Sequence, residues 1–484
     1  MSTVLTDSGG AAADGDVAFH VERHGIDLIP PSERWSRPRD LFGLWAGASV
    51  NFEYMIYGAV LMTFGVSFTQ AIWLILVGNL SYLLVGVCSL QGPQVGTTTF
   101  TINRASYGPN GSRLIALLNW ATCVGFEAEG LILVVLAGIA LAAKAGVSAG
   151  TPLKVGLVIG AAILQGVLPF LGHATMVKTL RLLALPFVAL YGIMAGLSLH
   201  HVHSVAQSAN WQGITVALAF VIVLSGLGWN QCGNDYSRYL PEDSSKAGII
   251  GWVFLGSAVP QVLLMLLGAA VATYLPTVGN NPISGFPHSF PGWFLVPFLV
   301  VAIVQLFSIN SLDLYSSGVT LQALGLRIKR SRAVVIDTVI SCGITAYAVF
   351  SSSFSKLLTD FADLVIVWLG PWTAIFLLDW LLRRRRYAAA DLARTDRGGR
   401  YWGQGGIHWP AIAAQVLGST AAMLTLNSSF SYAGWLSRLT SHGSCPIGPQ
   451  HCGADFSVFA GLVVGAAVYL VLAGRSVARE VVPA

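Results

Sequence analysis

Long apolar blocks separated by short polar joints are the dominant pattern along this chain. The blocks lack the polar–apolar alternation that marks the strands of a membrane barrel. About 20 apolar residues in a helix cross the ~30 Å hydrocarbon core of a bilayer. Because only helices and closed barrels satisfy their backbone polar groups inside lipid, the pattern predicts an all-α integral membrane protein.

The apolar blocks predict about twelve transmembrane helices, which we number as spans one to twelve. The polar segments at both ends predict a cytoplasmic N-terminal tail at 1–40, a twelve-helix membrane domain at 41–474 and a cytoplasmic C-terminal tail at 475–484. The spans cover approximately residues 41–66, 70–90, 113–143, 155–172, 180–199, 212–233, 247–275, 293–320, 333–352, 357–381, 408–426 and 455–474.

The overall composition excludes several classes of protein. The chain is 54% hydrophobic and 10% charged, whereas soluble domains carry about 25% charged residues. Its first ~20 residues lack a basic start followed by an apolar core, so no cleavable signal peptide is expected. The net charge of +5 comes from basic residues at helix ends, so no nucleic-acid partner is expected.

The basic residues predict the orientation of the chain, because Lys and Arg gather in cytoplasmic loops. With a cytoplasmic N-terminus, twelve spans place 23 of the 27 basic residues inside, including the run Arg383–Arg386. One missed or extra helix would reverse this bias in the rest of the chain. We therefore expect both termini on the cytoplasmic side of the cell membrane, either plasma or inner. The four basic residues left outside are Lys144, Lys154, Lys356 and Arg438.

The six cysteines form no metal-binding spacing, and no metal or cofactor is expected. Cys445 and Cys452 share one loop, where a disulfide is expected only if the loop is extracytoplasmic. The twelve-span topology permits this. The other four cysteines lie in apolar blocks and predict ordinary packing.

Four carboxyl groups, those of Glu53, Glu127, Glu129 and Asp313, lie inside predicted spans one, three and eight. Ionisable groups in membrane helices are costly and are candidates for function by default. The alternative is a structural polar contact or a position near a helix end. Glu127 and Glu129 are about 200° apart around a helix, so they cannot both face one cavity.

Two aromatic residues, Trp229 and Phe126, are candidates for stacking on a planar ligand. Trp229 stands beside Ser225, Gly226 and Gly228, which favour a break in the helix. The alternative for Trp229 is simple packing or an anchor at the membrane interface.

Five motifs in order resemble the purine–cytosine permeases of the nucleobase–cation symporter family. The resemblance covers the N-terminal tail to span eight, whereas spans nine to twelve match in hydropathy only. The motifs are ERHGIDLIPPSERWSRPRDLFGLW before span one, Asn51 and Gly58 within it, GPNGSRLIALLNWATCVGFEAEG at span three, GWNQCGNDYSRYLP at the end of span six and NSLDLYSSG in span eight.

The resemblance implies a LeuT-like fold of two five-helix inverted repeats, spans one to five and six to ten, plus two extra helices. The first helix of each repeat is broken near the midplane in such folds. Span one contains Gly47, Gly58 and Gly65 near its expected break. The implied function is alternating-access import of a nucleobase or related planar heterocycle, such as cytosine or a purine, in symport with a cation.

The same resemblance implies a substrate site with three departures from the family pattern. Phe126 occupies the position of a Trp in the family. Gly130 occupies the position of an Asn or Gln, and Glu127 or Glu129 is expected to take over the role of that amide. Asp313 replaces the second Asn of N-x-x-N, and an ionised Asp only accepts hydrogen bonds. The expected substrate-binding residues are Trp229, Phe126, Asp313, Asn310, Glu129, Glu53 and Asn51.

The coupling ion follows from another departure in span eight. Two hydroxyl side chains that bind sodium in relatives fall near Phe307 and Ser308, and Phe307 offers no oxygen. We therefore expect proton coupling, with Asp313 as the first candidate carrier and Glu129 as the second. In the alternative, Asp313 supplies the missing sodium ligand beside Ser308, in a sodium-coupled carrier of hydantoin- or allantoin-type rings.

Two further classes of protein lack their usual signals. A channel would need rings of charge or a carbonyl filter. A membrane-embedded enzyme would need a His, Cys and Asp cluster, whereas the HHVH run at 200–203 lies in an expected outer loop. The Walker A pattern is missing, so the chain is not expected to hydrolyse ATP or to be an enzyme.

Overall fold

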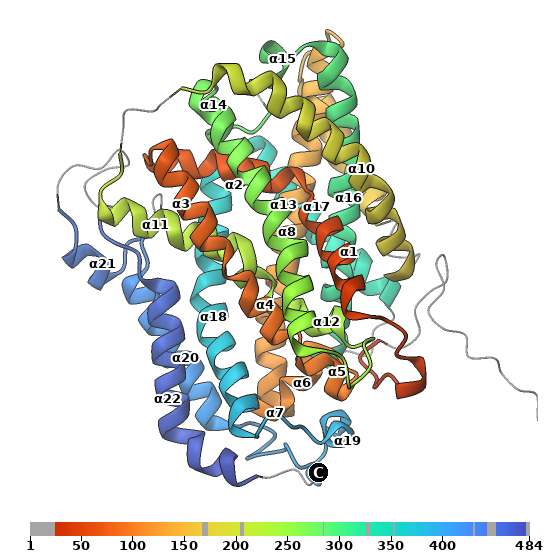
Figure 1. The fold of residues 1–484 in the computed structure, drawn as a ribbon, viewed down its shortest axis with the longest axis vertical. Helices are drawn as coiled ribbons and strands as arrows, with labels where there is room; N and C mark the ends of the chain where they lie inside the picture. The colour runs from red at the N-terminus through yellow and green to blue at the C-terminus, as the bar shows by residue number, and fades with distance from the viewer. Residues whose placement is uncertain are drawn as a thin grey trace, which may run out of the picture.

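The computed structural model is built almost entirely of helices packed along one long axis (Figure 1). It describes residues 25–166, 173–203, 208–283, 285–325, 330–351, 354–428, 431–442 and 452–480, with backbone only at 173–184, 330–331 and 351. Within these ranges the structure contains helices, turns and two isolated β-bridges but no β-strand.

Helices occupy the positions of all twelve predicted spans. Their bounds are α1 (Pro38–Ser49) with α2 (Phe52–Leu61), α3 (Phe68–Asn79) with α4 (Tyr82–Cys88), α8 (Pro109–Lys144), α9 (Thr151–Gln165), α10 (His173–Ser198), α11 (Trp211–Ile222) with α12 (Gly233–Ser237), α13 (Lys246–Tyr274), α16 (Gly292–Ala323), α17 (Arg330–Ser351), α18 (Phe354–Leu382), α20 (Trp409–Thr425) and α22 (Ser457–Arg479).

Eight helical segments in the described ranges are long and apolar enough to cross a membrane. They correspond to spans two, three, six to ten and twelve. Three further apolar helices are shorter, at Phe52–Phe64, Thr151–Gln165 and Leu185–His201. The helical membrane fold is therefore confirmed, whereas the count of twelve crossings stays a prediction.

The two halves of the bundle carry matching irregularities. Spans one and six are both interrupted, and short helices follow spans two and seven. Figure 1 places α6 (Thr99–Ile102) and α7 (Arg104–Tyr107) at the opposite end of the long axis from α14 (Thr277–Asn280) and α15 (Phe286–Ser289). Opposite placement of equivalent elements is what an inverted repeat requires.

Glycines set the close contact between α2 and α13. A Cβ on Gly58 would lie 1.9 Å from the Met265 carbonyl oxygen, and one on Gly268 would lie 1.7 Å from the Met55 carbonyl oxygen. Each helix thus accepts the backbone of the other. Gly58 therefore serves helix packing and not the break in span one.

The last two spans form a layer against α18 (Figure 1). Three glycines surround Pro371 of α18, namely Gly418 of α20 and Gly461 and Gly465 of α22. A Cβ atom on any of them would lie only 2.6–2.9 Å from the proline ring. Small residues allow the backbones to approach in this way.

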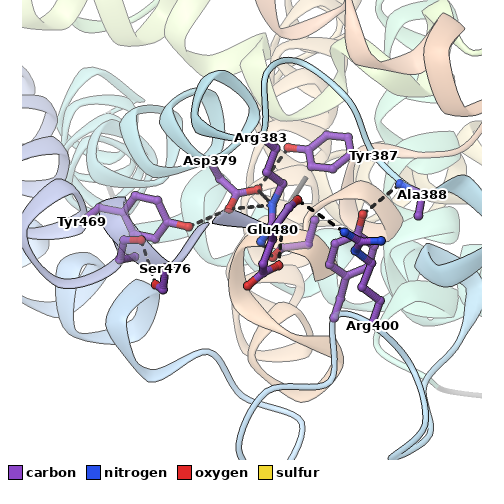
Figure 2. A network of polar contacts seen from close by, with 11 residues as sticks. Asp379, Arg383, Tyr387, Ala388, Arg400, Tyr469, Ser476 and Glu480 are labelled. Carbon is purple, nitrogen blue, oxygen red and sulfur yellow. Dashed lines mark hydrogen bonds and ion pairs between the residues drawn. The ribbon is translucent and has the colours of Figure 1, made fainter. Parts of the chain in front are cut away.

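A buried polar network joins the ends of α18 and α22 (Figure 2). The Asp379 carboxylate accepts hydrogen bonds from Arg383 Nε at 2.9 and 3.1 Å and from Tyr469 Oη at 2.7 Å. Arg383 also donates to Glu480 Oε2 at 2.5 Å and to the Ala105 carbonyl oxygen at 3.1 Å. Arg383 is therefore a buried structural residue as well as a basic signal of topology.

Cys452 takes part in a disulfide bond. Cys88, Cys123, Cys232 and Cys342 are free, as expected for packing residues. Cys445, the predicted partner of Cys452, lies outside the described residues.

Candidate functional site

Span one is interrupted at Val50 and Asn51, between α1 and α2. Their φ/ψ values of −76°/72° and −134°/143° leave the helical region. Asn51 caps α2, since its side chain accepts a hydrogen bond from Glu53 N at 3.2 Å and donates one to the Glu53 carboxylate at 2.9 Å. The structure thus brings the predicted site residues Asn51 and Glu53 together at the break.

Span six is interrupted where the sequence predicts it. α11 runs into a π-type turn at Val223–Leu227, and Ser225 within this turn has the non-helical values φ −108° and ψ −128°. Ser81 Oγ accepts a hydrogen bond from the freed Gly226 N at 2.9 Å. Trp229 follows directly, before the short turn Asn230–Cys232 and α12.

Both predicted stacking residues lie next to this second break. Trp229 Nε1 donates to Tyr54 Oη at 3.1 Å, and its ring packs edge-on against Trp45 with the centroids 5.6 Å apart. Phe126 comes from α8, and its Cζ would lie 3.4 Å from a Cβ on Gly228, the neighbour of Trp229. Both Trp229 and Phe126 are only partly buried, so each retains accessible ring surface.

The carboxyl groups of Glu53, Glu129 and Asp313 approach one another from three spans. They lie within electrostatic range of each other, and each residue is at most 8% exposed. Glu129 accepts a hydrogen bond from Tyr57 Oη of α2 at 3.0 Å. In the part of the chain that the structure describes, none of the three forms an ion pair with Lys or Arg.

Glu127 and Glu129 face different neighbours, as their spacing predicts. Glu127 Oε2 contacts Ser341 Oγ of α17 at 3.1 Å, whereas Glu129 faces α2. Of the two, only Glu129 contacts α2, which begins at the break in span one.

Asn310 and Gly130 form a matched pair between α16 and α8. A Cβ on Gly130 would lie 2.3 Å from Asn310 Oδ1, so the glycine leaves space for this amide. Asn310 Nδ2 donates to the Glu127 carbonyl oxygen and to Gln165 Oε1, both at 2.9 Å. Asn310 is therefore engaged in holding α8 and α9, which limits what its amide can offer a ligand.

Ser308, the candidate ion ligand, lies buried on α16 five residues before Asp313. Its Oγ donates to the Val304 carbonyl oxygen at 2.9 Å, one helical turn back. That bond leaves lone pairs on Oγ that can accept or coordinate. Phe307 is 9% exposed and contributes only a ring.

Several polar residues of this region were not singled out from the sequence. Tyr54 and Tyr57 follow the break in span one, and behind them Tyr82 donates a short hydrogen bond to Gln261 Oε1. Gln261 Nε2 in turn donates to Ser225 Oγ at 2.8 Å. Polar residues inside predicted spans carry the same signal as the carboxyls. The sequence alone could therefore have pointed to Gln261 of span seven and Asp337 of span nine.

The chain has relatives of known name along most of its length. Residues 28–442 match the family described as permeases for cytosine/purines, uracil, thiamine and allantoin. A putative purine-cytosine permease of Bacillus subtilis is 27% identical over 466 residues, which cover 93% of this chain and 96% of that protein. The cytosine permease of Escherichia coli K12 is 26% identical over 376 residues, 74% of this chain and 79% of that protein.

Solved structures confirm the fold. Mhp1, a nucleobase-cation-symport-1 family transporter in a closed conformation with bromovinylhydantoin bound, superposes with a TM-score of 0.74. It is 19% identical, with 95% of this chain and 96% of Mhp1 covered. An inward-facing Mhp1 structure gives a TM-score of 0.70 at 17% identity, with 98% and 99% covered.

Proposed function

The chain belongs to the family of permeases for cytosine/purines, uracil, thiamine and allantoin, and on this basis we propose that it is a proton-coupled importer of a nucleobase. It is a multi-pass membrane transporter and not an enzyme, as its relatives are permeases. The finer claims concern its substrate, its coupling ion and its direction of transport.

One observation carries the proposal, namely that two aromatic faces and three carboxyls converge where two helices are broken. Trp229 and Phe126 come from spans six and three, and the carboxyls of Glu53, Glu129 and Asp313 come from spans one, three and eight. Aromatic faces hold a planar ring while polar groups read its edge. Because carboxylates accept hydrogen bonds, the favoured substrate presents ring N–H or amino groups, as cytosine and the aminopurines do.

Proton coupling is supported by the lack of positive partners for these carboxyls among the residues that the structure describes. Three carboxyls close together inside a membrane without Lys or Arg cannot all be ionised at low cost. Taking up a proton relieves the repulsion and the desolvation together. In this proposal Asp313 loads a proton with the substrate and releases it after the site opens to the cytoplasm, with Glu129 as the second candidate.

The sodium-coupled alternative rests on Ser308 and Asp313 of the same helix. Ser308 Oγ and an ionised Asp313 would supply two oxygen ligands, and carbonyl groups freed at the break in span one would supply others. A hydantoin-type ring remains the alternative substrate, since Mhp1 was solved with bromovinylhydantoin bound.

Uptake into proteoliposomes tests the proposal. Purified protein is given radiolabelled cytosine, adenine, hypoxanthine, uracil, allantoin or hydantoin under an imposed proton gradient, with and without sodium. We expect accumulation of a nucleobase that a protonophore abolishes and sodium does not change. Accumulation that requires sodium and ignores the protonophore would refute proton coupling.

The variant Asp313→Asn tests the carrier within the same assay. The amide keeps the shape of the side chain but cannot titrate. We expect it to lose accumulation and to retain exchange of labelled for unlabelled substrate, which needs no net proton movement. Full accumulation by Asp313→Asn would move the proton to another residue.

A further inference from the structure

A second group of carboxyls lies inside the bundle, away from the helix breaks. Glu127 of α8 and Asp337 of α17 both have 0% exposure. They interact electrostatically with each other, and Glu127 also interacts with Asp313. Neither carboxyl forms an ion pair within the described ranges, so both lie in a membrane-spanning region without a positive partner.

α17 presents a polar face to the bundle and an apolar face outward. Asp337, Ser341 and Thr345 recur at every fourth residue, and each has 0% exposure. Thr345 Oγ1 donates to the Ala128 carbonyl oxygen at 3.4 Å, next to Glu127. Val335, Val339 and Tyr347 on the other face are 56–65% exposed. The polar face is therefore directed at α8, where Glu127 lies.

The hydrogen bonds around Ser341 allow Glu127 to hold a proton. Ser341 Oγ lies 2.7 Å from the Asp337 carbonyl oxygen and 3.1 Å from Glu127 Oε2. A hydroxyl has only one proton to donate, and the carbonyl oxygen can only accept. If the Ser341 proton goes to the carbonyl, Glu127 must donate to Ser341 Oγ, which requires a protonated carboxyl.

Asp337 has the opposite surroundings. Its Oδ1 accepts from Trp120 Nε1 at 2.7 Å, and its Oδ2 accepts a short hydrogen bond from Ser317 Oγ. Both oxygens of this carboxyl therefore act as hydrogen-bond acceptors. Two nearby carboxyls that cannot both ionise share a proton and titrate as a pair.

We propose that Glu127 and Asp337 form a second proton-binding site, which holds one proton between them and exchanges it with Asp313. Asp337 lies about 10 Å from the start of α17, at 1.5 Å per residue, and Ser341, the contact of Glu127, lies a further turn inward. The pair thus extends a route for the proton from Asp313 toward the end of the bundle where α17 begins. This role rests on the proposed proton coupling, whereas the existence of the site does not.

The groups that face the pair are few. From α8 they include Cys123, which interacts with Glu127 and with Asp313. From α16 there is Asp313, and from α17 there is Asp337 itself. The carboxyl Oε1 of Glu127 is buried and has no hydrogen-bond partner in the part of the chain that the structure describes, so nothing there stabilises a negative charge on this oxygen.

Infrared spectroscopy tests the site without reference to transport. Wild-type protein, Glu127→Gln and Asp337→Asn are titrated with acid and base in lipid, and the carbonyl-stretch bands of protonated carboxyls are recorded. We expect Glu127→Gln to lose one such band and Asp337→Asn to shift the pH at which that band disappears. The control Asp360→Asn changes a carboxyl that is 33% exposed and paired with Lys356, and it should leave the band unchanged. Retention of every protonated-carboxyl band in Glu127→Gln would overturn the proposal.

Transport then tests the role of the pair. In proteoliposomes we expect Glu127→Gln and Asp337→Asn to reduce proton-driven accumulation by about tenfold, with substrate exchange within about twofold of wild type. Unchanged accumulation in both variants would remove the pair from the proton route. If wild-type uptake instead requires sodium, the proposed function fails, and the infrared result alone decides whether the site exists.

Discussion

Trp229 occupies the junction of the two halves of span six, where its indole N–H bonds Tyr54 and its face remains partly accessible. We expect Trp229→Ala to weaken substrate binding by about 1–3 kcal/mol, the range for loss of an aromatic stacking platform. The measurement is binding of labelled substrate to purified protein, normalised to the amount of folded carrier.

A second tryptophan provides the control. Trp211 begins α11 and is 52% exposed, so Trp211→Ala should bind substrate as the wild type does. Equal affinity of Trp229→Ala and the wild type would exclude Trp229 from the site. Phe126→Ala should behave like Trp229→Ala, because the Phe126 ring lies against Gly228, the residue next to Trp229.

Individual site residues were only partly open to prediction from the sequence. The helix breakers beside Trp229 and the carboxyl groups inside apolar blocks are local signals, and the structure brings these residues together. The engagement of Asn310 with Gln165 and the Glu127 carbonyl is different. It depends on how three helices pack, which no local pattern contains.

At the scale of elements, α2 and α13 are held together by mutual close approach at Gly58 and Gly268. We expect Gly58→Ala to separate the two helices, because its methyl group would overlap backbone atoms that cannot move aside. We expect a lower yield of folded protein and a lower apparent melting temperature. Size-exclusion chromatography of samples heated to increasing temperatures measures both.

The matched control is Gly160→Ala in α9. A Cβ at Gly160 meets nothing within 4 Å, and Ala is the better helix former by about 1 kcal/mol. Gly160→Ala should therefore match or exceed the stability of the wild type. A Gly58→Ala protein as stable as Gly160→Ala would contradict the packing argument.

The breaks in spans one and six illustrate what element-level prediction can and cannot reach. In span six the predicted region contains the non-helical Ser225. In span one the break lies at Val50 and Asn51 and not at a glycine. Asn51 is a good helix cap, but a cap inside a long apolar block is easily read as one polar residue within a continuous helix.

At the scale of the whole molecule, the network of Figure 2 fastens the last span to the rest of the bundle. Burial disfavours the charged guanidinium of Arg383, but attraction to Asp379 and Glu480 outweighs this and raises its pKa. Arg383→Ala would leave the buried Asp379 carboxyl without its ion-pair partner. Removing one partner of a buried pair costs about 3–5 kcal/mol, so we expect a clear loss of thermal stability.

Arg394→Ala is the control for this prediction. Arg394 pairs with Asp396 on the surface, with side chains 48% and 64% exposed, and exposed pairs contribute at most about 1 kcal/mol. Thermal unfolding in the same detergent compares the two variants. Equal melting temperatures would show that the buried network does not stabilise the fold.

The orientation of the molecule in the membrane follows from its loops and remains a prediction. We expect an impermeant thiol reagent added to whole cells to label a cysteine introduced at Ser208 but not one at Gly398. Both positions lie in exposed loops, and basic residues favour the cytoplasm for the second. Labelling of Gly398→Cys alone, or of both positions, would overturn the twelve-span topology.

The general architecture could be predicted from the sequence because it follows from hydrophobicity alone. Blocks of apolar residues located a helix for every span, with ends that differ by up to seven residues, as at α9 (Thr151–Gln165) and α10 (His173–Ser198). The number of full crossings is less certain from length, since α9 has 15 residues and α20 has 17. Such short helices depend on their neighbours for their position in the bilayer.

The carboxyls that lack positive partners have a consequence for the electrical behaviour of the carrier. If Asp313 is neutral when loaded and ionised when empty, carriage of a neutral base is electroneutral, and the empty carrier returns with a negative charge. The membrane potential, about 2.3 kcal/mol per charge per 100 mV, then acts on the return step. An interior-negative voltage would drive the vacant site back toward the outside and so would accelerate the return of the empty carrier.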